Sequence, residues 1–236
     1  MYQVGVRPSY DTGFAQWPGM SEYPQLWEGL VAAYAPFLGM TGNKVFDLSG
    51  NGNTGTFSVG NPTWITGKFG SAIDFTGNDR IYTPSYIDAI TQTTPFSFGF
   101  GFRADSEARN TFLFAQNRNG SDRFSFICTD NASLRISMSF YNGAAYRSQK
   151  TADRSYDGKW HFIFGVFDGI NNPDIYFDGL LDNSGAATGS IGSSATGRLC
   201  IGYTNDCPLD VISIYNRALS ASEIALLYQL MMRMAG

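Results

Sequence analysis

The chain has few of the side chains on which most enzymes and metal centres depend. Its 236 residues include one histidine, His161, and three cysteines, Cys128, Cys200 and Cys207. No Cys-x-x-Cys pair or cysteine–histidine cluster occurs, which argues against a structural zinc site. The odd number leaves at least one thiol unpaired within the chain. A Cys200–Cys207 disulfide and buried free thiols both fit the spacing, and we favour the free thiols.

Positive charge and long apolar runs are also scarce. The 16 Lys+Arg residues are outnumbered by 20 Asp+Glu residues, and the net charge is -4. Nucleic-acid binding requires a basic surface, so we expect no nucleic-acid partner. No apolar run approaches the roughly 20 residues that span a bilayer. Residues 1–10 lack the basic start and apolar core of a secretory signal. We therefore expect no membrane partner and no signal peptide.

Groups that catalyse hydrolysis are missing from the segments with strong strand signals. Glycoside hydrolysis needs two carboxyl groups that flank one bond. Asp174 and Asp178 could face the same way on a hairpin, but a role in forming turns explains them better than catalysis does. A nucleophilic triad would need His161, the only histidine, which follows Trp160, so strand alternation sends the two side chains to opposite faces. We predict that the chain is not an enzyme. All its glutamates lie outside the strong strands: Glu22, Glu28, Glu107 and Glu223.

What the chain does contain is a dense pattern of strands and turns. Asp-Gly pairs, which suit tight hairpin turns, bound the aromatic segments 160–167 and 174–177. In Thr94–Arg103 four phenylalanines alternate with Ser97, Gly99 and Gly101. The small residues leave room either for a ligand or for close packing of another segment, and we favour packing. Further strands are predicted at Leu30–Phe37, Thr111–Ala115, Arg123–Cys128, Leu134–Phe140, Arg198–Gly202 and Val211–Tyr215.

The two ends of the chain differ from this pattern. Residues 1–26 are aromatic and broken by prolines, which indicates an extended N-terminal arm, and residues 27–236 form one predicted domain. Near the C-terminus Ser220 and Glu223 form a capping-box signature. Apolar residues follow at helical spacing, so we expect a short helix that docks on the sandwich. A methionine patch for a partner is the alternative. The apolar stripe is Ile224, Leu227, Leu230, Met231 and Met234.

Four landmarks resemble the laminin-G-like, concanavalin A-like jelly-roll family in its bacterial and viral form. They are Asp47–Gly55 (DLSGNGNTG), Gly67–Phe75 (GKFGSAIDF), the Trp160-His161 strand with Tyr176–Gly179 (YFDG), and Leu209–Ser220 (LDVISIYNRALS). The resemblance covers about residues 27 to 230. The family also carries a histidine at the position of His161, so the resemblance implies that His161 is a packing or hydrogen-bonded residue. It implies an all-β, two-sheet antiparallel jelly-roll sandwich, here with a short C-terminal helix and an extended N-terminal arm. The fold hosts lectins, adhesion modules and virion proteins, so it does not fix one function.

The resemblance also implies a calcium site, because members of the family often hold Ca²⁺ at a sheet edge. The candidate ligands are Asp47, Asn51, Asn53 and Asp210. Calcium takes six to eight oxygen ligands. Val211 stands where the family often has a second acid, which weakens the contribution of that strand. The alternative is that the Asp47 loop is a turn capped by side-chain hydrogen bonds.

Since the composition argues against enzymatic, nucleic-acid and membrane roles, binding or assembly is the function that we expect. Sugar recognition uses aromatic platforms beside polar groups, but tyrosines that only cover the core edge are the alternative. We predict a virion surface protein, made in the host cytoplasm, that contacts other subunits or itself through the arm and adheres to surface glycans. The alternative is an extracellular, calcium-dependent carbohydrate-binding module of a bacterial surface or polysaccharide-processing system. The candidate glycan-binding residues are Tyr82, Tyr141, Asn142, Tyr146 and Tyr203.

Overall fold

The structure is a computed structural model, and it describes eleven stretches of the chain. These are residues 22–36, 39–77, 79–84, 94–103, 111–118, 122–128, 136–142, 146–152, 157–183, 199–202 and 207–233. The predicted arm, residues 1–26, lies mostly outside them. The division of the chain at residue 26 therefore stays a prediction.

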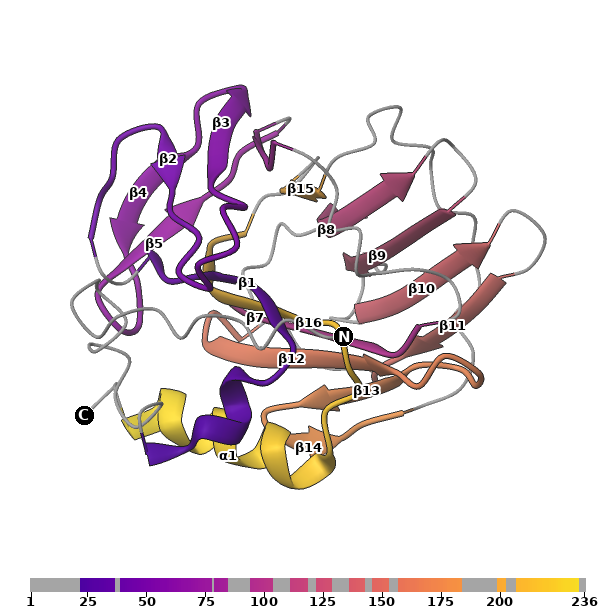
Figure 1. Cartoon of the computed structure of the whole chain (residues 1–236). Helices are drawn as coiled ribbons and strands as arrows, with labels where there is room; N and C mark the ends of the chain where they lie inside the picture. The colour runs from indigo at the N-terminus through magenta and orange to yellow at the C-terminus, as the bar shows by residue number, and fades with distance from the viewer. Residues whose placement is uncertain are drawn as a thin grey trace.

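Two antiparallel sheets pack face to face in the described residues (Figure 1). The first, called here the helix-side sheet, has the order β14 (Leu180–Leu181), β13 (Asp174–Phe177), β12 (Trp160–Phe167), β7 (Phe96–Arg103), β16 (Leu209–Tyr215), β5 (Ser71–Asp74) and β4 (Thr63–Thr66), and β1 (Leu30–Tyr34) also pairs with β16. The second, the distal sheet, has the order β11 (Tyr146–Lys150), β10 (Ile136–Asn142), β9 (Asp122–Cys128), β8 (Thr111–Arg118), β15 (Leu199–Ile201), β6 (Arg80–Tyr82), β3 (Gly55–Val59) and β2 (Lys44–Val45).

The predicted all-β sandwich is confirmed, and several strands begin and end where the sequence places them. β12 and β13 coincide with the segments between the Asp-Gly turns. The first strand was predicted to reach Phe37 but ends at Tyr34. Pro36 follows two residues later, and proline has no N–H to donate to a ladder, so the strand cannot continue through it. The short strands β2, β3, β4, β6, β11 and β14 were not predicted as strands.

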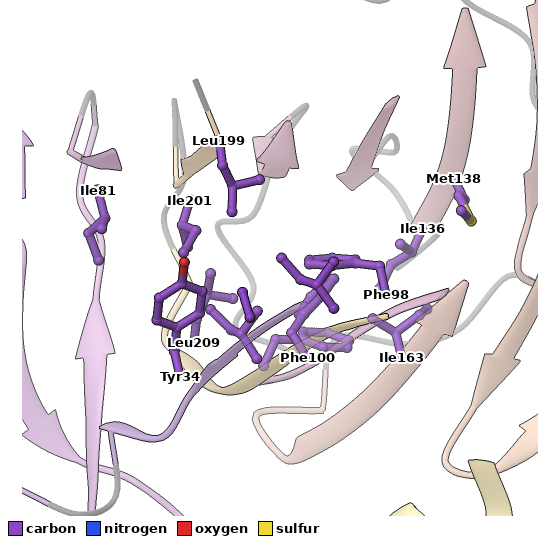
Figure 2. Packing of buried hydrophobic residues seen from close by; sticks show 14 of the residues in the cluster. Tyr34, Ile81, Phe98, Phe100, Ile136, Met138, Ile163, Leu199, Ile201 and Leu209 are labelled. Carbon is purple, nitrogen blue, oxygen red and sulfur yellow. The ribbon is translucent and has the colours of Figure 1, made fainter. Parts of the chain in front are cut away.

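The main core lies between the two sheets, and Figure 2 shows part of it. Phe98, Phe100 and Ile163 rise from the helix-side sheet, and Leu199 and Ile201 face them from the distal sheet. All five are at most 1% exposed. Burial of an aromatic or branched aliphatic side chain of this size stabilises a fold by about 1.5–3 kcal/mol. This layer is therefore the main source of stability.

The small residues of β7 are covered on the opposite face by close packing, as favoured from the sequence. A Cβ atom on Gly99 would lie 2.2 Å from the ring of Phe164, and one on Gly101 would lie 2.9 Å from the ring of Phe162. Ser97 donates its hydroxyl to the Arg217 carbonyl at 2.9 Å. This face of the sheet therefore holds no room for a ligand at these positions.

A second apolar cluster joins the outer face of the helix-side sheet to the helix α1 (Ala221–Arg233), which lies beneath β12–β14 in Figure 1. Ser220 and Glu223 form the predicted capping box: the Ser220 amide donates to Glu223 Oε2 at 2.8 Å. The expected docking of the helix on the sandwich is confirmed, although Met234 lies outside the described residues. The 3-10 helix Pro24–Trp27 buries Leu26 in the same cluster. The buried helix residues are Ile224, Leu227, Leu230 and Met231.

Among the described residues, no helix has the length and apolar character needed to cross a membrane. Cys200 and Cys207 are buried free thiols, which agrees with the favoured alternative. Burial raises the pKa of Cys200 to about 12. This thiol is therefore a packing residue and not a reactive one.

Candidate functional site

The Asp47 loop is closed by hydrogen bonds to its one carboxylate. Asp47 Oδ1 accepts from the amides of Ala33 at 3.0 Å and Ser49 at 2.9 Å. Its Oδ2 accepts from the Ser49 hydroxyl at 2.9 Å and the Asn53 amide at 2.9 Å. Each oxygen thus serves two donors, so the carboxylate ties the loop to itself and to β1.

The two asparagines of the loop also face the protein. Asn53 Nδ2 donates to the Val31 carbonyl at 2.9 Å. Asn51 Nδ2 lies 3.1 Å from the Leu30 carbonyl and 3.2 Å from that of Val31. The Tyr34 hydroxyl donates to the Asn53 carbonyl at 2.7 Å. These bonds are those of a capped turn, which was the alternative to calcium.

Asp210 lies apart from this network, in the middle of the helix-side sheet. It is 0% exposed, and its Oδ1 accepts from the Val211 amide at 2.8 Å. Its Oδ2 is buried without a hydrogen-bond partner and faces Gly67, where an added Cβ would come within 3.1 Å. Burial raises the pKa of Asp210 to about 7. A bulge in β16 and a positive φ of 33 at Val211 place the carboxyl group there.

Among the described residues, Asp210 has no hydrogen bond to the other three predicted calcium ligands. Asp47, Asn51 and Asn53 are engaged by protein donors and acceptors, and Asp210 offers a single carboxylate oxygen. No group of three or more His, Cys, Asp or Glu side chains within the described stretches is placed to hold a metal ion. The donor set therefore does not fit Ca²⁺ in this conformation. Calcium binding itself stays an untested prediction.

The four candidate glycan-binding residues that fall in the described stretches lie on the distal sheet. Tyr141 and Tyr146 stand opposite each other in the register of β10 and β11, and Asn142 pairs with Asp122 of β9. Tyr82 is on β6, four strands from β10 in the sheet order. At about 4.8 Å per strand, that separation is roughly 19 Å.

Tyr82 is also less accessible than a sugar platform requires. It is 8% exposed, and its hydroxyl accepts from Arg80 at 3.0 Å. Tyr203 lies outside the described residues. The structure therefore brings together Tyr141, Asn142 and Tyr146 along the backbone, and it leaves Tyr82 elsewhere.

The one histidine, near the first residue of β12, connects the turn before β12 with the turn after β13. His161 Nδ1 lies 2.8 Å from Asp178 Oδ2, and its Nε2 lies 3.2 Å from Asp157 Oδ1. The hydrogen bond to Asp178 is the main cause that raises the pKa of His161. The imidazole is 17% exposed and packs 4.8 Å from the Phe177 ring. The interpretation of His161 as a hydrogen-bonded residue is confirmed.

Two features were not predicted from the sequence: the carboxylate pair around His161 and the isolated carboxyl group of Asp210. Asp157 and Asp178 were interpreted only as turn residues, although Asp157 precedes the first residue of β12 by three positions and Asp178 directly follows β13. The pairing of β12 with β13 brings Asp178 back to the start of β12. The Asp-Gly turns predict a hairpin of β12 and β13, and drawing the register of that hairpin would have placed Asp178 beside His161.

A family model described as the concanavalin A-like lectin/glucanases superfamily matches residues 75–225, which is more than half of the chain. The chain belongs to this superfamily. Its two packed antiparallel sheets agree with the match. No curated protein sequence matches the chain.

Solved structures with the same fold include toxin domains and a module of a polysaccharide-degrading enzyme. The binding domain of Paraclostridial Mosquitocidal Protein 1 has a TM-score of 0.66 and 18% identity, with 86% of this chain and 52% of that chain covered. Domain 4 of AbnA, a GH43 extracellular arabinanase from Geobacillus stearothermophilus in complex with arabinotriose, has a TM-score of 0.65 and 19% identity, with 85% and 98% covered. The binding domain of botulinum neurotoxin DC in complex with SialylT has a TM-score of 0.62 and 15% identity, with 86% and 52% covered. The chain thus spans about half the length of the two toxin binding domains.

Proposed function

We propose that this domain is a carbohydrate-binding module without enzymatic activity. The observation that carries the proposal is the likeness to domain 4 of the arabinanase, which extends over 98% of that domain and which was solved with arabinotriose. The neurotoxin binding domain in complex with SialylT is a second relative in fold that was solved with a ligand. This setting favours the alternative drawn from the sequence, an extracellular module, over a virion subunit.

The architecture supports a location for the sugar on the distal sheet or its edges. The outer face of the helix-side sheet is occupied by α1 and the 3-10 helix. The proposed site is the end of the β10–β11 hairpin, where Tyr141 and Tyr146 are register partners and Asn142 follows. β11 is the last strand in the order of the distal sheet, so the hairpin lies at its edge. Tyrosines supply aromatic surface for sugar rings, and an asparagine supplies a donor and an acceptor.

The hydrogen bonds made by carboxylates of the described residues support a binding role over a catalytic one. Asp47, Asp79 and Asp168 each accept hydrogen bonds from backbone amides of their own turns. Asp178 accepts from Phe162 N at 2.9 Å as well as facing His161. These groups are engaged in holding turns, and a glycosidase needs a free acid and a free base or nucleophile across one bond.

The test is a glycan array that includes arabino-oligosaccharides and sialylated glycans, followed by titration calorimetry with each glycan that binds. We expect saturable binding that is lost in the Tyr141→Ala/Tyr146→Ala variant. The matched control is Tyr228→Phe, which keeps the ring that contacts Gly179 on the far side of the helix-side sheet. Circular dichroism confirms that each variant folds.

Absence of saturable binding across the array would refute the proposed function. Binding that survives in the double tyrosine variant would refute the site and keep the function. Repeating the positive titration in EDTA tests the calcium prediction separately. We expect the same affinity, because the Asp47 loop is closed by protein donors.

A further inference from the structure

A histidine and two aspartates join the turns at the two ends of the β12–β13 segment. Asp157 precedes β12, and its Oδ1 also accepts from the Lys159 amide at 2.9 Å. Asp178 follows β13 and holds the Phe162 amide through Oδ1 while Oδ2 faces His161. The imidazole thus lies between two carboxylates, one on each ring nitrogen. Only a doubly protonated imidazole donates to both at once.

The contact between His161 and Asp178 affects the rest of the domain through the turn at Asp178. Asp178 has a positive φ of 50, which is uncommon for a residue with a side chain. The next residue, Gly179, packs against Tyr228 of α1 and leads into the edge strand β14. The Asp178 amide donates to the Phe162 carbonyl at 2.8 Å. This turn therefore attaches the β13–β14 hairpin both to the helix-side sheet and to α1.

We propose that His161, Asp157 and Asp178 form a proton-operated clasp that holds the β13–β14 hairpin against the domain at mildly acidic pH and loosens as the pH rises. Proton loss from His161 leaves one ring nitrogen without a hydrogen, so one carboxylate loses its donor. The hairpin end then depends on the backbone bonds of Asp178 alone. The proposal is independent of sugar binding, and its test uses no sugar.

The charged groups around the clasp agree with this direction. Among the described residues, Lys159 Nζ lies 3.7 Å from Asp157 Oδ2 on the exposed side. On the helix side burial, and after it the charge of Asp178, raises the pKa of Tyr228, which stays neutral near pH 7. Both carboxylates favour the protonated imidazole, and burial opposes it. The folded-state pKa of His161 is raised, so its stabilising contribution is complete below the unfolded value of 6.5 and is lost as the pH passes the folded value.

The experiment is an NMR titration of the full chain, in which the single histidine gives one imidazole signal, combined with amide hydrogen exchange from pH 6 to 9. We expect the imidazole to titrate above 6.5. The protection of the Asp178 amide, corrected for intrinsic exchange and divided by that of β7 amides, should fall as His161 deprotonates. Each pKa unit above the unfolded value corresponds to about a tenfold loss of protection. In the His161→Gln variant the protection should be low and independent of pH.

Two further variants keep the result decisive. Asp157→Asn removes one carboxylate from an exposed turn, and it should lower the pKa of His161 even if His161→Gln does not fold. Asp174→Asn is the matched control, because this carboxylate is on the same hairpin but contacts Asn183. It should leave the titration of His161 unchanged. A His161 pKa at or below 6.5, or wild-type protection that does not depend on pH, would overturn the proposal.

Discussion

Replacing Asp210 with asparagine should stabilise the protein at alkaline pH and destabilise it in acid. The Asp210 carboxyl is 0% exposed, and its Oδ2 has no hydrogen-bond partner. Burial raises its pKa from 3.8 to about 7. Because the folded value is above the unfolded one, folding favours the neutral acid. The contribution of the neutral Asp210 carboxyl group to the unfolding free energy is complete below pH 3.8 and is lost as the pH rises through about 7.

The size of the effect follows from the two pKa values. At about 1.4 kcal/mol per pKa unit, the interval from 3.8 to about 7 corresponds to about 4 kcal/mol of unfolding free energy lost between acid and alkaline pH. The amide of Asn keeps the acceptor for Val211 N and cannot ionise. Its Nδ2 faces the site of Oδ2 without an acceptor, which costs about 1–3 kcal/mol. We therefore expect Asp210→Asn to gain about 1–3 kcal/mol of unfolding free energy above pH 8 and to lose about 1–3 kcal/mol at pH 4.

Urea denaturation at several pH values between 4 and 9 measures both curves, with EDTA present so that no cation can compensate the carboxylate. The quantity of interest is the difference in unfolding free energy between the variant and the wild type. It should rise steadily with pH and level off once Asp210 is ionised. A difference that stays constant or falls with rising pH would refute the reasoning, because it would mean that the ionised carboxylate has a partner.

Three further perturbations test other parts of the structure. Gly99→Ala places a Cβ 2.2 Å from the Phe164 ring and should lower the unfolding free energy in urea by about 1–3 kcal/mol, the usual cost of overpacking; an unchanged value would contradict the packing described for β7. Asp47→Ala removes the acceptor of four hydrogen bonds and should cost about 2–4 kcal/mol equally with Ca²⁺ and with EDTA; a cost seen only with Ca²⁺ would assign the loop to the metal. Glu223→Gln removes a group whose pKa is lowered to about 2, chiefly by Arg217, so the variant should be less stable at neutral pH and should match the wild type as the pH falls toward 2; a deficit that persists in acid would point to the cap and not to the charge.

The strands that could be predicted from the sequence are those long enough to show an alternating or aromatic-rich pattern, such as β7, β12 and β16. β12 and β13 are joined by one Asp-Gly turn, and their aromatic residues alternate, so pattern and pairing agree. The capping box of α1 is likewise local. The short strands β2 and β6 were missed because two or three residues are too few to show such a pattern. β6 is also held by β15, a partner from a distant part of the chain.

The candidate site was harder to predict because the state of a polar side chain depends on contacts that the sequence does not display. Asp47 has the spacing of a calcium ligand, but the amide of Ala33, fourteen residues earlier, occupies one of its oxygens. Asp210 stands in a strand, and only the bulge at Val211 isolates its carboxyl group. Tyr82 looked like a loop tyrosine and is part of β6, where it is buried.

The titrating groups of the described residues combine into one expectation about the pH at which this domain is most stable. Asp210 and His161 have raised pKa values, so their contributions are largest in acid and fall as the pH rises above 3.8 and 6.5 respectively. Glu223, Asp157 and Asp168 have lowered pKa values, so theirs are complete above 4.5 or 3.8 and fall in stronger acid. The two trends cross between these limits, which places the maximum on the acid side of neutrality, below the range of about pH 5–8 usual for proteins. A maximum at or above neutral pH would contradict this expectation, and a cation beside the Asp210 carboxylate would be the first explanation to test.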